Sequence, residues 1–386
     1  MNAPIAIDRH RTLLVPQGEF VLERKPRDAN LQAWDAADEY LLGYLDECHV
    51  LSRRGKLLIL NDAFGALAVA LAGRPVYSWN DSCLAQQALA DNLVANGYPA
   101  SQVVINSGVE LPSTDVDFVL IKIPKSLALL EHQLYALRPI LHHDTLILGA
   151  GMARNIHRST LELFESLLGP TTTTRARKKS RLIMVERDHS INEGQSPYPD
   201  SYELVVDRSY RISNHASLFS RDRLDRGSRL MIEHLPVDER FRSIVDLGCG
   251  NGVLGIIAAA MNPAASLLFC DESHMAIDSA RVNFQSAFGP AREAEFRLGD
   301  GLEGVAGHSA ELVLINPPFH QHHSIGDRVA RNMFRDAHRV LAAGGELRVV
   351  GNRHLGYHLR LRKLFGNCTT VASDSKFVIL SVTKSS

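Results

Sequence analysis

Short apolar runs alternate along the chain with longer segments whose apolar residues recur every three or four positions. In the first half, the runs occupy residues 57–60, 76–79, 117–121, 145–149 and 181–185. Runs of this length, rich in branched and aromatic side chains, are typical of strands buried on both faces of a parallel sheet. The longer segments predict helices that cover the sheet, so the pattern indicates an α/β fold.

The second half repeats the same alternation. Its runs lie at residues 243–245, 266–270, 312–315, 346–350 and 377–380, each beginning 186 to 201 residues after its counterpart. Self-similarity on this scale predicts an ancient duplication. We expect two tandem domains with mostly parallel sheets, residues 1–187 and 202–386, and a polar linker with prolines and a glycine at 188–201.

Three further segments have patterns that predict secondary structure. Residues 31–42 and 221–235 place apolar positions at helical spacing and predict amphipathic helices. Residues 202–214 alternate apolar and polar positions, which predicts a hairpin.

Composition places few limits on the partner. The 386 residues are 45% hydrophobic and 22% charged, as in ordinary globular proteins, and the net charge is −1. Any nucleic-acid site must therefore be a local basic patch. Five scattered cysteines without a CxxC motif suit a reducing compartment and argue against a disulfide framework. The sequence shows neither a signal peptide nor a membrane span, so we expect a cytoplasmic protein with no membrane partner.

A glycine-rich loop follows the first strand of the second half. Residues 246–252 read Asp-Leu-Gly-Cys-Gly-Asn-Gly and open a predicted helix. Glycine in this setting allows a tight turn and close approach of a ligand to the backbone. Asp271 closes the next strand, where it can bind ribose hydroxyls. At this point a nicotinamide cofactor and S-adenosylmethionine (AdoMet) are both open.

Two features favour AdoMet. Asp246 lies just before the glycines. A carboxylate there could reach the ammonium of a methionine moiety, but it would repel the negative charge of a pyrophosphate. No later pair of residues offers acid–base chemistry for hydride transfer. Asp300 follows the third strand and is placed to meet an adenine amino group. The candidate cofactor-binding residues are Asp246, Gly248, Gly250, Asn251, Asp271 and Asp300.

The tetrapeptide Asn-Pro-Pro-Phe follows the buried run that ends at Ile315. Open α/β sheets bind ligands at the carboxyl ends of their strands. Two prolines make the loop stiff and leave it without N–H donors. The side-chain oxygen of Asn316 and the carbonyl of Pro317 could accept both hydrogens of a planar NH2 group, while Phe319 stacks on its ring. The candidate catalytic residues are Asn316, Pro317, Pro318 and Phe319.

The first half lacks both features. Asn61, Ala63 and Gly65 stand where the second half has its glycines, and Lys122-Ile-Pro-Lys125 replaces Asn-Pro-Pro-Phe. We therefore expect a degenerate copy that kept the fold and changed its role; for a chain that acts on RNA, we expect this copy to be the RNA-holding module. The candidate RNA-binding residues are Lys122, Lys125, Arg175, Arg177, Lys178 and Lys179.

On these motifs the second half resembles a class I (Rossmann-like) AdoMet-dependent methyltransferase acting on amino nitrogen. The whole chain resembles the bacterial ribosomal RNA guanine-N2 methyltransferases with a duplicated domain. Residues 32–42, 60–67, 219–225 and 316–320 are most similar to the large-subunit members. The resemblance implies two seven-stranded sheets, AdoMet as cofactor, 23S ribosomal RNA as partner, and methylation of a specific guanine at N2. It implies no obligate protein partner, and we expect a monomer.

Other functions remain open on sequence. They are guanine-N2 methylation of small-subunit RNA, N5-methylation of a protein glutamine, DNA adenine methylation, and a non-enzymatic role as an RNA-binding assembly factor with a relic pocket. The intact glycines and Asn316 argue against the relic. The histidines at 320, 322 and 323 have no ligand spacing and no accompanying carboxylate or thiolate, so no metal site is expected. We expect them to form a lid or to contact RNA.

Overall fold

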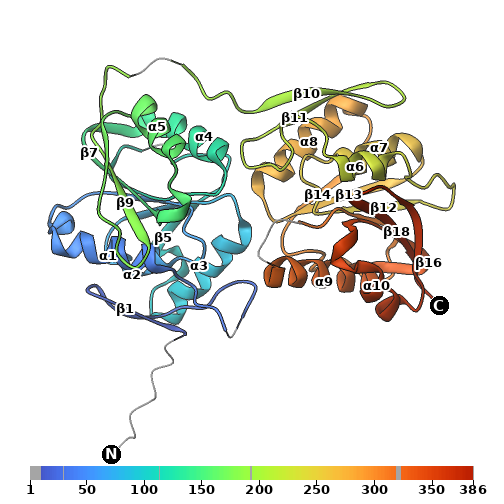
Figure 1. Ribbon diagram of the computed structural model, residues 1–386, viewed down its shortest axis with the longest axis horizontal. Helices are drawn as coiled ribbons and strands as arrows, with labels where there is room; N and C mark the ends of the chain where they lie inside the picture. The colour runs from blue at the N-terminus through green and yellow to red at the C-terminus, as the bar shows by residue number, and fades with distance from the viewer. Residues whose placement is uncertain (1–9, 29, 113, 192–193, 319–322, 386) are drawn as a thin grey trace, which may run out of the picture. The chain divides into compact units, whose positions relative to one another are not determined.

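The computed structural model describes residues 10–28, 30–112, 114–191, 194–318 and 323–385 (Figure 1). The chain forms two compact units, Met1–Pro197 and Tyr198–Ser386. Within the described residues, no helix combines the length and apolarity that crossing a lipid bilayer requires.

The first unit is built around a seven-stranded sheet with the strand order β5-β4-β3-β6-β7-β9-β8. Neighbouring strands from β5 to β7 are parallel, whereas β9 runs antiparallel to β7 and β8 runs antiparallel to β9. Its strands and longer helices are β1 (Thr12–Val15), β2 (Gly18–Val21), α1 (Ala36–Glu47), β3 (Leu57–Leu60), α2 (Ala66–Ala70), β4 (Val76–Trp79), α3 (Cys83–Ala95), β5 (Val103–Asn106), β6 (Val116–Lys122), α4 (Leu127–Leu137), β7 (Leu141–Met152), α5 (Arg158–Leu167), β8 (Thr171–Thr173) and β9 (Ser180–Val185).

The second unit has the same plan, with the strand order β14-β13-β12-β15-β16-β18-β17. Parallel pairing again runs from β14 to β16, and β18 and β17 add two antiparallel pairings. Its strands and longer helices are β10 (Asp200–Val205), β11 (Ser209–Asn214), α6 (Arg226–Ile232), β12 (Ser243–Leu247), α7 (Val253–Met261), β13 (Ser266–Asp271), α8 (His274–Phe288), β14 (Glu295–Leu298), β15 (Ala310–Ile315), α9 (His323–Val340), β16 (Leu341–Asn352), α10 (Tyr357–Phe365), β17 (Thr369–Ser373) and β18 (Phe377–Thr383).

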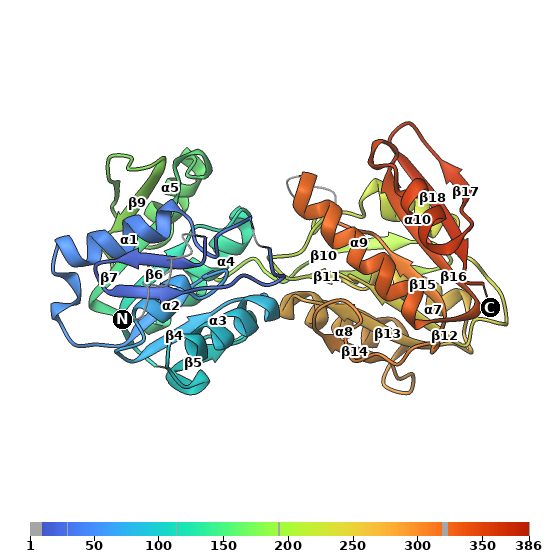
Figure 2. The ribbon, with the colours of Figure 1, turned by 90° about the horizontal axis from the view of Figure 1, so that it is seen from below.

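Helices cover both faces of the second sheet. Along β12, Ile244 packs into a core shared with α7 and α8, while Val245 and Leu247 pack into the opposite core with α9 and α10 (Figure 2). Because alternate side chains enter different cores, the strand is apolar at almost every position. The apolar runs thus correctly predicted an α/β fold, and the family resemblance correctly implied two seven-stranded sheets, each of which is mixed.

The predicted hairpin is present as β10 and β11, but two helix predictions were wrong in extent. Helix α1 begins at Ala36 and not at residue 31, because Asp35 caps it by accepting from the N–H groups of Ala37 and Asp38. Helix α6 spans only Arg226–Ile232, because Asp225 forms the same kind of cap within the predicted helix. The apolar spacing did not reveal either cap.

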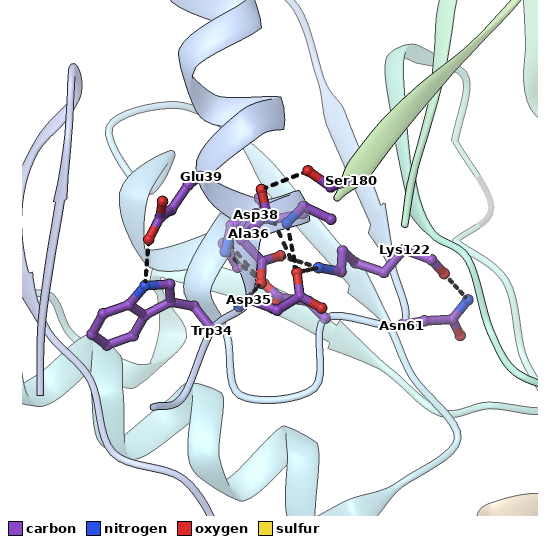
Figure 3. Close-up of polar contacts among 12 residues, drawn as sticks. Trp34, Asp35, Ala36, Asp38, Glu39, Asn61, Lys122 and Ser180 are labelled. Carbon is purple, nitrogen blue, oxygen red and sulfur yellow. Dashed lines mark hydrogen bonds and ion pairs between the residues drawn. The ribbon is translucent and has the colours of Figure 1, made fainter. Parts of the chain in front are cut away.

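An ion-pair cluster joins α1 to β6 in the first unit (Figure 3). Asp38 is buried in it, Lys122 is half-buried and Asp35 is exposed. The Lys122 ammonium lies 2.8 Å from Asp35 Oδ1 and 2.6 Å from Asp38 Oδ1. Burial alone would lower the pKa of Lys122, but the two carboxylates outweigh burial and raise it. Burial also raises the pKa of Asp38, although Lys122 opposes that shift. Lys122 is therefore the counter-ion that allows two acidic side chains to lie at this strand end.

Replacing Lys122 with methionine should destabilise the first unit by about 3–5 kcal/mol, because the buried Asp38 carboxylate then lacks its cation. The deficit should shrink as the pH falls, since protonation of Asp35 and Asp38 removes the unpaired charges. Both tryptophans of the chain, Trp34 and Trp79, lie in this unit, so urea unfolding followed by tryptophan fluorescence reports on it.

Lys125→Met is the matched control, because Lys125 is exposed and near the same strand end. Its unfolding free energy should stay within about 0.5 kcal/mol of the parent. Equal unfolding midpoints for the two variants would show that the cluster does not stabilise the unit.

Candidate functional site

Three parallel strands of the second unit end at the same edge of the sheet. Leu247, the last residue of β12, pairs with Cys270 of β13 and with Ile315 of β15. The loop after β12, the end of β13 and the loop after β15 are therefore neighbours. Chain order reverses between β13 and β15 on either side of β12, and open sheets bind ligands at such a switch point.

The glycine loop has the backbone expected for close approach of a ligand. Gly248, Gly250 and Gly252 have φ of 71°, 53° and 79°, a region that side chains other than glycine enter at a cost. The N–H groups of Gly248 and Cys249 both donate to the carbonyl of Cys270, which anchors the loop to β13. A Cβ at Gly250 would meet no described atom within 4 Å, so the space above this residue is open.

Two carboxylates accept hydrogen bonds from the backbone of the loop and of the helices next to it. Asp246 is 1% exposed, and its Oδ2 accepts from the Gly255 N–H at 2.8 Å, which fixes the start of α7. Burial, assisted by the charge of Asp271, raises the pKa of Asp246 to about 7. Asp271 is half-buried; its oxygens accept from the N–H groups of Gly250 and Ser273, both at 3.0 Å.

Asn251 serves the architecture of the loop. Its side chain is buried, donates to Asn214 Oδ1 at 2.8 Å and accepts from the Val253 N–H at 3.2 Å. Asn283 on α8 donates to the Asn251 carbonyl at 2.9 Å and to that of Ser213 at 2.8 Å. These amides connect the β10–β11 hairpin, the glycine loop and α8.

Asn316 follows β15, and a hydrogen bond connects its side-chain amide to α6. Its Nδ2 donates to Ser228 Oγ on α6 at 2.9 Å. Its Oδ1 is buried, and no described residue donates a hydrogen bond to it. Buried polar atoms usually have partners, so an unpaired acceptor at a ligand-binding edge indicates a place for a donor from a bound molecule. Pro317 beside it is buried and Pro318 is exposed.

The structure brings Asp246, Asp271 and Asn316 to one edge of the sheet. The positions of the other predicted site residues differ from one another. Asp300 lies in the turn after β14, exposed, and the neighbouring Gly299 N–H donates to the Asp271 carbonyl at 3.0 Å. Phe319, His320 and His322 lie outside the described residues, and His323 begins α9. No group of three His, Cys, Asp or Glu side chains in the described chain could hold a metal ion.

The candidate RNA-binding residues of the first unit fall into two groups. Lys122 is part of the ion-pair cluster with Asp35 and Asp38, Arg177 Nη1 lies 2.8 Å from Glu47, and Lys178 Nζ lies 2.6 Å from Glu39. Their cations therefore already have anionic partners. Lys125, Arg175 and Lys179 are exposed.

Sequence reasoning missed Ser228 and Asn214. The Ser228–Asn316 contact joins positions 88 residues apart, so no local pattern could reveal it. The local feature that positions this serine is the cap by Asp225, whose Oδ1 accepts from the Ser228 N–H at 3.0 Å. Asn214 is fully buried at the end of an alternating strand, and the sequence pattern did not predict that this polar residue would be buried.

Two protein-family models match this chain. The RLMG N-terminal domain family matches residues 10–189, and the methyltransferase small domain family matches residues 209–381. Among solved structures, a T. thermophilus 16S rRNA N2 methyltransferase in complex with AdoMet and guanosine superimposes with a TM-score of 0.75 at 21% identity, covering 98% of each chain. At that identity the likeness concerns the fold.

Curated relatives are similar over nearly the whole length. The Streptomyces coelicolor protein named ribosomal RNA large subunit methyltransferase G is 48% identical over 378 residues, covering 96% of this chain and 100% of the relative. The Erwinia tasmaniensis protein of the same name is 49% identical over 373 residues, covering 95% and 97%. The chain therefore belongs to the ribosomal RNA large subunit methyltransferase G family.

Proposed function

We propose that this protein transfers a methyl group from AdoMet to the N2 amino group of a specific guanine in 23S ribosomal RNA. The observation that carries the proposal is the orientation of Asn316, whose Nδ2 is bound to Ser228 and whose buried Oδ1 is left to accept. The names of the large-subunit relatives supply the class of RNA. The site is assembled from one unit of one chain, so the proposal needs no second copy and we expect a monomer.

The glycine loop and its neighbours fit AdoMet. Gly250 leaves open space above a backbone with positive φ, and Asp271 lies beside it at the strand end. We propose that Asp271 holds the ribose hydroxyls, Asp300 meets the adenine amino group, and Asp246 attracts the methionine ammonium. Gly248, Gly250 and Asn251 shape the loop. When bound, AdoMet supplies an electrophilic methyl group on a sulfonium.

The chemistry of the chain is positioning. A guanine amino group is a poor nucleophile because its lone pair is delocalised into the ring. In the proposal, Asn316 Oδ1 and the Pro317 carbonyl accept its two hydrogens, which favours a tetrahedral nitrogen with its lone pair free. Phe319 stacks on the base, and Pro318 keeps the loop stiff. As nitrogen gains the methyl group it loses a proton to solvent. Positioning of this kind can supply on the order of 7–11 kcal/mol.

The proposed reaction predicts labelled methyl transfer to deproteinised large-subunit RNA, recovered as N2-methylguanosine. Asn316→Ala should lower the rate at saturating RNA by about 10²–10³, the range found for removal of one group aimed at a transition state. Ser228→Ala should lower it roughly tenfold, because the amide loses one hydrogen bond and can rotate. AdoMet affinity, measured by calorimetry, should not change in either variant.

Ser228→Thr is the control that keeps the hydroxyl and should retain more activity than Ser228→Ala. In an Asn316→Ala background, Ser228→Ala should have no further effect on rate, because its role is to orient that amide. Additive losses would refute the orientation role. Label on small-subunit RNA or on release factor, with none on large-subunit RNA, would refute the proposed substrate.

The raised pKa of Asp246 predicts that AdoMet affinity depends on pH. In the folded protein without ligand, the Asp246 pKa is raised from 3.8 to about 7, so its contribution to stability is present below 3.8 and lost as the pH rises through about 7. A bound ammonium favours the ionised form. Affinity measured by calorimetry should therefore increase as the pH rises through about 7, until the amino group itself loses its charge near pH 8. Asp246→Asn should lack this increase, and an identical profile would contradict the ammonium contact.

We also propose that the two units arose by duplication and that the first, residues 1–187, is a degenerate copy that holds RNA. The identical strand order supports this origin. So does Asn61, whose φ of 61° matches the 71° of Gly248 at the corresponding strand end. Residues 188–201 then form the linker to the catalytic domain, residues 202–386. Because Lys122, Arg177 and Lys178 have carboxylate partners, Lys125, Arg175 and Lys179 carry the RNA-binding role.

The triple variant with glutamine at Lys125, Arg175 and Lys179 should bind large-subunit RNA more weakly with AdoMet affinity intact. The slope of log affinity against log salt should fall by about 0.7–0.9 for each phosphate that the variant no longer binds. Filter binding across a salt series measures both quantities. Arg54→Gln is the control, since Arg54 is exposed and precedes β3 at the other end of the sheet. An unchanged slope would refute the RNA-binding role.

A further inference from the structure

An arginine-lined cavity lies beside the candidate site in the second unit. Its volume is about 570 Å³, within the range of small-molecule sites. The lining comes from one segment, the turn before α6 and the first turns of that helix. The lining residues are Leu218, Ser220, Arg221, Asp222, Arg223, Leu224, Asp225, Arg226 and Arg229.

The charges in this cavity are not balanced. Arg221 pairs with Asp222 at 3.0 Å, and Arg226 pairs with Asp374 at 3.1 Å. The Asp225 carboxylate is occupied in capping α6. Arg223 and Arg229 are exposed, and within the described part of the chain neither has a carboxylate at ion-pair distance.

The cavity is connected to both parts of the candidate site. On one side, Ser228 precedes Arg229 on α6 and accepts the hydrogen bond from Asn316. On the other side, Tyr202 lies close enough to Asp225 and Arg229 for both charges to act on its hydroxyl, whose pKa burial raises to about 12. The same hydroxyl lies 3.5 Å from Asn251 Nδ2 in the glycine loop. Through Ser228 and Tyr202, the segment that carries Arg229 is therefore connected to both Asn316 and the glycine loop.

We propose that this cavity binds a backbone phosphate of the RNA strand that presents the target guanine, with Arg223 and Arg229 as the phosphate ligands. This inference rests on the proposed function and identifies a further part of the same site. A base enters such a pocket only after leaving its stack, which costs a few kcal/mol, so the strand on either side must be held. Contacts to phosphate fix register and carry no sequence information.

Arginine suits this role better than lysine. Its planar guanidinium can donate two parallel hydrogen bonds to phosphate oxygens and never deprotonates at physiological pH. The backbone beneath is rigid, because Asp225 caps α6 and Gly227 packs where a Cβ would lie 3.2 Å from the Phe377 ring. A phosphate held here would hold its nucleotide near Asn316 without contact to the reacting nitrogen.

The test uses Arg223→Gln, Arg229→Gln and the double variant in the full-length protein, with deproteinised large-subunit RNA as the probe. Each single change should weaken RNA binding about tenfold, as expected for one charge-assisted hydrogen-bonding group. Each should reduce the salt slope by about 0.7–0.9. In the methyl-transfer assay KM for RNA should increase by a similar factor, while kcat at saturating RNA stays within about twofold.

Arg242→Gln is the matched control, because Arg242 is exposed and precedes β12 at the opposite end of the sheet from the cavity. It should behave as the parent. Parental RNA affinity and salt slope in the double variant would overturn the proposal, and so would a fall in kcat with RNA affinity unchanged. If the parent binds large-subunit RNA with this arginine dependence but transfers no methyl group, the phosphate site stands and the proposed reaction fails.

Discussion

A hydrogen bond from Asn316 Nδ2 to Ser228 Oγ holds one amide at the ligand-binding edge, with its oxygen as the end that is left without a described partner. A primary amide can rotate to present a donor or an acceptor, and the two choices would suit opposite substrates. Because Ser228 takes the donor end, the buried Oδ1 remains without a partner in the described structure. Leaving such an acceptor unpaired costs about 1–3 kcal/mol. That cost is intelligible if the acceptor is reserved for a bound amino group.

The same strand end in the first unit shows the opposite solution. Lys122 follows Ile121 there as Asn316 follows Ile315, since each isoleucine pairs with the last residue of the central strand. Its ammonium has two carboxylate partners, and its carbonyl accepts from Asn61 at 3.0 Å. One sheet edge is therefore satisfied internally and the other is left open. Under the proposed duplication, a lysine at the position of Asn316 accounts both for the loss of the ligand site and for one partner of the internal ion pair.

The sequence pattern predicted those structural features that depend on residues close together in the chain. The apolar runs identified five of the seven strands in each sheet, and the glycines and Asn-Pro-Pro loop identified the edge where the candidate site lies. Strand ends and turns are encoded within a few residues. The partners of Asn316 and Lys122 were out of reach, since Ser228 and Asp35 lie 88 and 87 residues away along the chain. Helix starts were also missed, because a cap by Asp35 or Asp225 overrides apolar spacing. The role of Asn251 depends on hydrogen bonds with Asn214 and Asn283. A short sequence motif does not include such distant partners.

Under the proposed duplication, the turn after the central strand suggests how the fold could be kept while a ligand site was lost. The chain passes through a left-handed conformation at Gly248 and again at Asn61, and asparagine tolerates that region better than most side chains. Glycine leaves the space beside the turn empty. The Asn61 side chain instead forms hydrogen bonds to Gln133 and to the Lys122 carbonyl. The backbone path thus favours glycine or asparagine at this position, and glycine is the choice that leaves the space beside the turn empty.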